Sequence, residues 1–231
     1  MEDLITVSTE PEAEQPLPVH EHSKVGRRYD RVAALYDLYD APMELAGGRR
    51  RRERVISGAE GRVLEVGIGT GRNLAYYREP ARLIGIDLSP RMLGRASRRV
   101  RGTDLGAQLA QADVERLPFA DASFDTVTAT CVFCSVADPV AGLAEVARVT
   151  KPTGRVLLLE HVWPTGCVGG WLADRVSPIT RRLFGPSLNR RTEENARAAG
   201  LLLQQVRRRG VWREIVATPR QDHEGRPAPG S

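Results

Sequence analysis

The chain has 231 residues, of which 41% are hydrophobic, and a formal net charge of +5. This length and apolar content suffice for one α/β domain whose core needs neither a disulfide nor a structural metal. Only Lys24 and Lys151 among the 34 basic residues are lysines, so the arginine excess indicates a compositional bias rather than a particular partner. No apolar run approaches the ~18 residues of a membrane-spanning helix.

Residues 1–23 are predicted to form a disordered acidic tail. The first 22 residues contain six acidic side chains and no Lys or Arg. So little apolar surface cannot offset the entropy lost on folding. The segment lacks the basic start and the apolar core of a secretory signal, so we expect a cytoplasmic protein. Residues 220–231 are likewise expected to be a flexible tail, and residues 24–219 a single domain.

The three cysteines are expected to remain reduced. Cys131 and Cys134 form a C-x-x-C pair inside an apolar run, and Cys167 lies further along the chain. Neither a second cysteine pair nor a histidine cluster completes a zinc site, so buried packing is favoured over metal binding or redox chemistry.

Two helical segments are predicted within residues 24–60. The first contains Tyr29 and Tyr36 at helical spacing. The second, from Pro42 to Ala59, carries five arginines in six positions, interpreted as a solvated face. Because no aromatic residues alternate with these arginines, as they do in single-strand binders, we predict no nucleic-acid partner.

The segment Arg62 to Asn73, RVLEVGIGTGRN, is the most informative part of the chain. Its apolar run containing Glu65 predicts a buried parallel strand, and the glycines at alternate positions predict a tight turn into a helix. Glycine tolerates positive φ and lets the backbone approach a ligand. The pattern therefore predicts a nucleotide-type pocket at the carboxyl edge of a sheet.

This turn suits one of two kinds of cofactor, a dinucleotide that carries a pyrophosphate or a nucleoside cofactor that does not. The glycine spacing G-x-G-x-G differs from the G-x-G-x-x-G of dinucleotide sites, which argues against a pyrophosphate. A second predicted strand ends at Asp87, about 20 residues after the turn, where a carboxylate accepts hydrogen bonds from both ribose hydroxyls. That acid suits either cofactor.

The remaining chain predicts alternating helices and strands, then an antiparallel pair. Ser89 and Asp138 are expected helix N-caps, each followed by a proline at the first helical position. The expected elements are a helix over 73–77, a helix over 90–100, strands over 107–111 and 124–130, a helix over 138–149, a turn over 151–154, a strand over 155–160, a helix over 192–199 and strands over 201–208 and 211–218.

His161 follows the fifth predicted strand, at the edge where active groups of parallel sheets gather. An imidazole has the intrinsic pKa to accept a proton, so His161 is the candidate acid/base or acceptor-orienting residue, with Glu160 as the second candidate and a structural histidine as the alternative. The insertion over 163–191 is longer than most connections. We expect it to cap the acceptor pocket, or to contact a membrane surface through its Trp, Leu and Phe residues.

Four motifs in this order, E-V-G-I-G-T-G, G-I-D-L-S-P-R-M-L, D-V-E-R-L-P-F and S-F-D, resemble class I S-adenosylmethionine (SAM) methyltransferases. The weaker motifs C-V-F-C-S-V, L-L-L-E-H-V and N-R-R-T-x-x-N resemble a subgroup that includes bacterial phospholipid N-methyltransferase-like proteins and thiol S-methyltransferases. The resemblance implies a Rossmann-like α/β fold with a mostly parallel seven-stranded sheet and helices on both faces. It also implies SAM as the cofactor, S-adenosylhomocysteine as its product, and no metal.

The resemblance further implies roles for individual residues. Tyr36, and less directly Tyr29, would close over the methionine end of SAM, so Tyr36 joins His161 as a catalytic candidate. Leu88 and Met92 would flank the adenine, Asp113 would accept its amino group, and the Val114 backbone would pair with a ring nitrogen. The implied cofactor-binding set is Tyr29, Tyr36, Glu65, Gly67, Gly69, Gly71, Asn73, Asp87, Leu88, Met92, Asp113, Val114, Thr130 and Cys131.

The acceptor is expected to be a small, fairly apolar molecule. Transfer from a sulfonium carbon mainly needs aligned reactants, and no strong general-base pair is evident, which favours a thiol. The alternatives are a phospholipid amine, a quinone-like or natural-product ring, or a SAM-binding subunit without catalysis. The sequence does not predict the oligomeric state.

Overall fold

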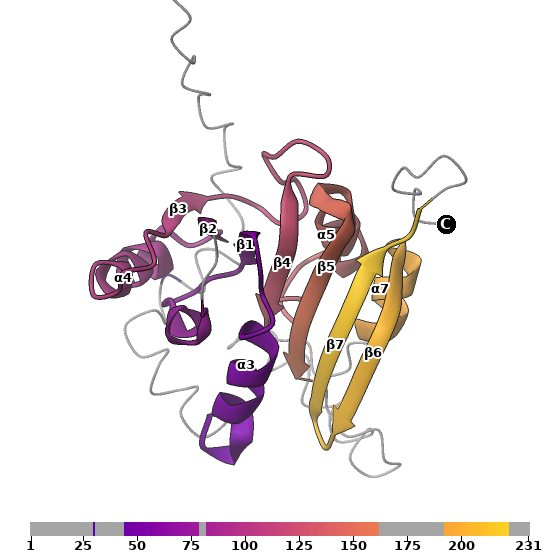
Figure 1. Cartoon of the computed structure of the whole chain (residues 1–231), viewed down its shortest axis with the longest axis horizontal. Helices are drawn as coiled ribbons and strands as arrows, with labels where there is room; N and C mark the ends of the chain where they lie inside the picture. Colours follow the sequence, from indigo (N-terminus) through magenta and orange to yellow (C-terminus); the bar gives the residue numbers. More distant parts are fainter. Residues whose placement is uncertain (1–29, 31–43, 79–81, 162–191, 222–231) are drawn as a thin grey trace, which may run out of the picture.

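The computed structural model describes residues 30, 44–78, 82–161 and 192–221 (Figure 1). Residues 1–23, the segment containing Tyr29 and Tyr36, the 163–191 insertion and most of residues 220–231 lie outside this range, so those assignments stay predictions. In chain order the elements are η1 (π-helix, Glu44–Gly48), α3 (Arg49–Ile56), β1 (Arg62–Val66), η2 (3-10 helix, Arg72–Tyr76), β2 (Arg82–Asp87), α4 (Pro90–Val100), β3 (Gln108–Gln111), β4 (Phe124–Thr130), α5 (Pro139–Val149), β5 (Thr150–His161), α7 (Thr192–Ala198), β6 (Leu201–Arg209) and β7 (Trp212–Pro219).

The described strands form one seven-stranded sheet in the order β3-β2-β1-β4-β5-β7-β6. Strands β1 to β5 pair in parallel, whereas β7 runs antiparallel between β5 and β6. The strand order reverses between β1 and β4, and crevices at such switch points are where open α/β sheets bind ligands. The predicted Rossmann-like architecture is confirmed.

Helices pack on both faces of the sheet (Figure 1). On one face, Leu143 and Val146 of α5 and Ala196 of α7 join the core formed with β4 and β5. On the other face, Ile56 of α3 and Ala96 of α4 belong to a second core. The sheet is therefore buried from both sides, which explains why its central strands are apolar almost throughout.

Local sequence signals define the N-terminal ends of helices α4 and α5. Ser89 accepts a hydrogen bond from the Met92 N–H, and Asp138 accepts from the N–H groups of Val140 and Ala141. A proline follows each cap at the first helical position, where its fixed φ suits a helix and its missing N–H is not needed. Both predicted N-caps are confirmed.

Three predicted elements differ from the structure. The expected helix after the glycine turn is the short 3-10 helix η2, and Tyr77 after it is extended because its hydroxyl bonds to Glu65 and Thr128. The turn over 151–154 lies inside β5 as a bulge, because the pairing jumps from Phe124↔Thr150 to Thr126↔Arg155. The helix expected over 42–59 begins as a π-turn at Glu44 and ends at Ile56.

Candidate cofactor site

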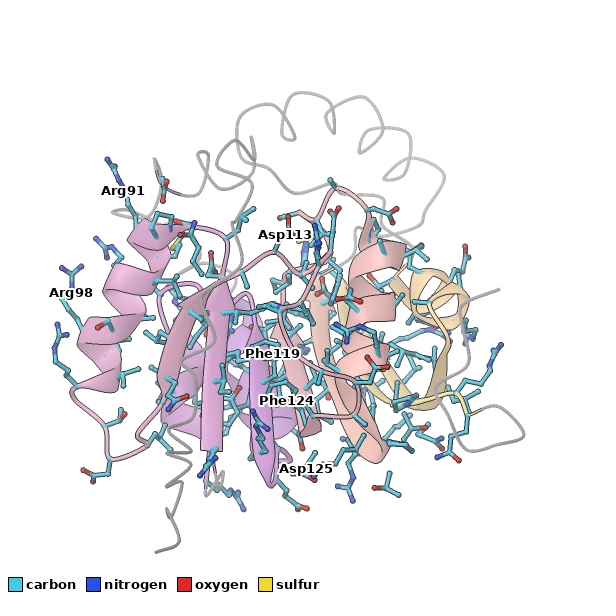
Figure 2. All side chains as sticks on the ribbon, turned by 90° about the horizontal axis from the view of Figure 1, so that it is seen from above. Arg91, Arg98, Asp113, Phe119, Phe124 and Asp125 are labelled. Atoms are coloured by element: carbon cyan, nitrogen blue, oxygen red, sulfur yellow. The ribbon has the colours of Figure 1, made fainter. Side chains whose placement is uncertain are left out.

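A cavity of about 390 Å³ opens where the parallel strands β1, β2 and β4 end. Its volume lies within the range of small-molecule sites. Figure 2 shows Asp113 near this edge of the sheet and Asp125, at the start of β4, near the opposite edge. Nine of the fourteen predicted cofactor residues line the cavity, and the following paragraphs take them wall by wall.

The glycine turn forms the first wall. Gly67, Gly69 and Gly71 all have positive φ, at 64°, 57° and 83°. A Cβ on Gly67 would lie 2.5 Å from Val132 Cγ2, so glycine is needed there for space as well as for conformation. Gly67 and Gly69 line the cavity, whereas Gly71 begins η2 and is not among its lining residues.

Asp87, at the end of β2, presents a half-buried carboxylate to the same cavity. Its Oδ2 accepts from the Gly69 N–H at 2.9 Å and its Oδ1 from the Ser89 N–H at 2.8 Å. Each oxygen keeps a second lone pair for a ligand hydroxyl. Burial raises the pKa of Asp87 to about 6 despite these two hydrogen bonds.

The second wall comes from the ends of β2 and β3. Leu88 and Met92 follow Asp87, and Asp113 and Val114 follow β3. The Asp113 Oδ1 accepts from the Glu115 N–H at 3.0 Å, which fixes the carboxylate beside the cavity. Apolar side chains next to one fixed carboxylate suit a flat base that carries an amino group.

The third wall is the end of β4 and the loop after it. Thr130 and Cys131 line the cavity, and Cys131 has a φ of 56°, in the left-handed region that a non-glycine residue rarely adopts. The N–H groups of Val132 and Phe133 both donate to Glu160 Oε1, at 3.0 and 3.1 Å. The loop is therefore held from β5, the neighbouring strand.

Glu65 and Asn73 are not among the lining residues and lie behind the glycine turn. Asn73 Nδ2 donates to Glu65 Oε1 at 2.7 Å, and the Tyr77 hydroxyl donates to Glu65 Oε2 at 3.0 Å. Burial raises the pKa of Glu65 to about 7. The geometry of this pair is that of a support for the turn, and their contact with the cofactor stays a prediction.

Arg52 belongs to the same buried network. Its NH1 donates to Asn73 Oδ1 at 2.9 Å and to Thr130 Oγ1 at 2.8 Å, and its NH2 pairs with Glu44 at 2.7 Å. Only 6% of Arg52 is exposed. The interpretation of the arginine run as a wholly solvated face was therefore wrong for Arg52, because α3 turns this one side chain inward.

His161 lies at the carboxyl end of β5 and is not among the lining residues. Its ring packs edge-on against Trp212, with 5.6 Å between ring centroids. Burial lowers the pKa of His161, so the imidazole is neutral at pH 7. Its predicted acid/base role stays a prediction, as does that of Tyr36, which lies outside the described residues.

The sequence analysis missed eight lining residues: Val66, Ile86, Ala112, Glu115, Val132, Ser135, Val136 and Ala137. Each lies at the carboxyl end of a predicted strand or in the connection that follows one, so the rule that ligands bind beyond carboxyl strand ends could have found them. Within the described residues, no group of three or more His, Cys, Asp and Glu side chains could hold a metal ion.

The cavity fits a nucleoside. Asp87 is a half-buried acid held by the N–H groups of Gly69 and Ser89, Asp113 is fixed beside an apolar wall, and the turn has no side chain at Gly67 or Gly69. Fold and site together define a Rossmann-like nucleoside-binding protein.

Comparisons with known proteins identify the family. The family model described as "Methyltransferase domain" matches residues 64–158. Phosphatidylethanolamine N-methyltransferase of Cereibacter sphaeroides is 37% identical over 139 residues, which cover 59% of this chain and 68% of that protein. Demethylmenaquinone methyltransferase of Renibacterium salmoninarum is 32% identical over 189 residues, covering 80% and 76%. The crystal structure of the YcgJ protein from Bacillus subtilis has a TM-score of 0.60 at 28% identity, covering 69% of this chain and 71% of that one.

The chain belongs to the class I SAM-dependent methyltransferases and is related to the phospholipid N-methyltransferases. It is an enzyme, and its cofactor is SAM. In the described part of the chain, no helix has the length and apolar character to cross a membrane.

Proposed function

We propose that this enzyme methylates the amine of a phospholipid headgroup. The observation that carries the proposal is the 37% identity to a phosphatidylethanolamine N-methyltransferase. The matched family segment, residues 64–158, includes all three walls of the cavity. The thiol expected from the sequence has no support among these relatives, whose names denote amine and quinone acceptors.

Bound SAM supplies an electrophilic methyl carbon, so the protein's main task is to hold the reactants close and aligned. In the proposed complex, Asp87 accepts from the ribose hydroxyls, and Asp113 and Val114 hold the adenine. This places the methionine end of the cofactor against Thr130 and Cys131. The parallel sheet thus directs the transferred group toward the ends of β4 and β5.

A protonated amine must lose its proton before it attacks a methyl carbon. His161 is the proposed acceptor for this proton, because a neutral imidazole has a free ring nitrogen and burial, which lowers the pKa of His161, favours that neutral form. It lies at the end of β5, the strand next to the proposed transfer point. We therefore retain His161 as the proposed proton acceptor, and Tyr36 as a proposed contact of the cofactor.

Methylation of a quinone ring is the second candidate. The observation that favours it is the 32% identity to a demethylmenaquinone methyltransferase over 80% of this chain. Both candidate acceptors are lipid-soluble, which agrees with the predicted membrane contact of residues 163–191. That contact and the cytoplasmic location remain proposals.

The test is a turnover assay of the purified enzyme with SAM, measuring S-adenosylhomocysteine release. The acceptor panel is phosphatidylethanolamine in mixed micelles, a demethylated quinone in the same micelles, and a small aromatic thiol. We expect turnover with phosphatidylethanolamine above that of micelles alone. Turnover with the quinone only would favour the second candidate, and turnover with the thiol only would contradict both.

A further inference from the structure

Glu160 is a buried acid that the proposed chemistry leaves without a role. It is 0% exposed, and its Oε2 has no hydrogen-bond partner among the residues that the structure describes. An unpaired polar atom in the interior costs free energy. Such local costs in native proteins concentrate at functional sites. The position of the other carboxylate oxygen indicates what this residue does.

Glu160 Oε1 binds the backbone of the loop that follows β4. It accepts from two successive N–H groups, those of Val132 and Phe133. The residue before them, Cys131, has positive φ, and its own N–H donates to the Leu159 carbonyl at 2.8 Å. Successive N–H groups after a left-handed residue make a small anion-binding concavity. Here a side chain from the next strand fills it.

This loop is a wall of the cofactor cavity. Cys131 and Val132 line the cavity, and the side chain of Val132 lies against Gly67 of the glycine turn, where an added Cβ would be 2.5 Å from Cγ2. Glu160 is therefore connected to the glycine turn through Val132, by a hydrogen bond to its backbone N–H and by packing of its side chain against Gly67. The distance between the loop after β4 and the glycine turn, at the proposed transfer end of the cavity, depends on these contacts.

We propose that Glu160 is a positioning residue for methyl transfer, whose carboxylate holds the Cys131–Val132 wall against the glycine turn and so fixes the methionine end of the cofactor. Glu160 acts through this backbone and does not itself line the cavity. The inference rests on the methyltransferase activity but not on which acceptor is methylated.

The proposal predicts an effect confined to one end of the cofactor. Asp87 and Asp113, on the far walls, hold the nucleoside, so adenosine needs little from the Glu160 loop. S-adenosylhomocysteine also occupies the transfer end. Calorimetric titration with both ligands therefore separates a local loosening of this wall from a general loss of structure.

For Glu160→Ala we expect the dissociation constant of S-adenosylhomocysteine to rise about tenfold and that of adenosine to change less than about twofold. Glu160→Gln keeps an oxygen that accepts both N–H groups, so its affinity should return to within about threefold of wild type. Glu160→Asp, which retains the charge but is shorter by one methylene, should weaken S-adenosylhomocysteine about fivefold. Glu160→Asp decides the question if the alanine variant does not fold.

The matched control is Val156→Ala, which is also fully buried in β5 and belongs to the core on the α5 face. It should lower the melting temperature without changing either affinity. The proposal is overturned if Glu160→Asp and Glu160→Ala bind S-adenosylhomocysteine as wild type does, or if both ligands weaken together. If the enzyme methylates a different acceptor, these affinities would not change. Failure of the proposed acceptor can therefore be told apart from failure of the positioning role of Glu160.

Discussion

Asp87 and Glu160 are both carboxylates at the carboxyl edge of the sheet, but Asp87 is half-buried and Glu160 fully buried, and they serve opposite sides of the cavity. Asp87 lines the cavity, and each of its oxygens accepts one backbone N–H. Glu160 lies behind the wall, and its Oε1 accepts two N–H groups while its Oε2 has no partner within the described part of the chain. The β2 side is therefore built to contact a ligand, and the β5 side to hold the segment that does.

The largest effect should follow from removing the contacting acid. Asp87→Ala should weaken SAM binding on the order of 100-fold, because the ribose hydroxyls lose a charged acceptor. Calorimetric titration measures the change. The matched control is Asp125→Ala: this exposed acid pairs with Lys151 at the opposite edge of the sheet, and its loss should leave the affinity intact. Unchanged affinity in Asp87→Ala would mean that the cofactor lies elsewhere.

The contact between the two sides can be broken at Gly67. Gly67→Ala should weaken SAM binding about 20-fold, because the new Cβ meets Val132 and the backbone stays at positive φ. Adding Val132→Ala should recover part of the loss by removing the clash. Gly94 on α4 has open space around it, so Gly94→Ala is the control and should bind normally. Full affinity in Gly67→Ala would show that the walls are not in contact.

On the β5 side, His161→Ala should lower kcat about tenfold with nearly unchanged SAM affinity, because the proposed proton acceptor is removed while the cofactor walls remain. Trp212→Phe is the companion variant, since it keeps an aromatic ring beside position 161. It should retain most of the turnover. A full-rate His161→Ala enzyme would exclude the proposed role.

The last effect concerns the pH dependence of folding stability rather than binding or turnover. Burial raises the pKa of Glu160 to about 7 from 4.5, so the folded state keeps a proton that the unfolded state releases. The resulting stabilisation is complete below pH 4.5, is lost as pH rises through 7, and is on the order of 3 kcal/mol. Urea unfolding of wild type and Glu160→Gln at pH 5 and pH 8 measures it. Between these two pH values, the free energy of unfolding should fall more for wild type than for the variant. Equal losses would contradict the raised pKa of Glu160.

The cofactor side was largely predictable from the sequence. Local signals produced it: glycines at alternate positions, an acid ending a strand, and Ser89 and Asp138 before prolines. Gly67, Gly69 and Asp87 consequently line the cavity, as does Asp113, whose role only the family resemblance implied. Each of these signals depends on neighbours within a few positions, which a single sequence displays directly.

The supporting residues were not predictable in the same way. Arg52 looked like one of five solvated arginines, yet α3 places it against Asn73 and Thr130, 21 and 78 positions away. Glu160 was predicted only as a second acid/base candidate at the end of a strand, and its hydrogen-bond partners belong to a loop 27 and 28 positions earlier. No local pattern specifies such pairs, because the distance between the two groups exists only once the sheet is assembled.

The sequence by itself determined the class of fold, the order of its strands and helices, and the residues of the glycine turn, because backbone conformation and hydrophobic periodicity are local properties. The tertiary structure decided which side chains face the cavity and which stand behind it. Glu65 and Asp87 are both acids near the turn, but only Asp87 faces the cavity. Pairing between β1, β2 and β4 fixes the direction in which each side chain points.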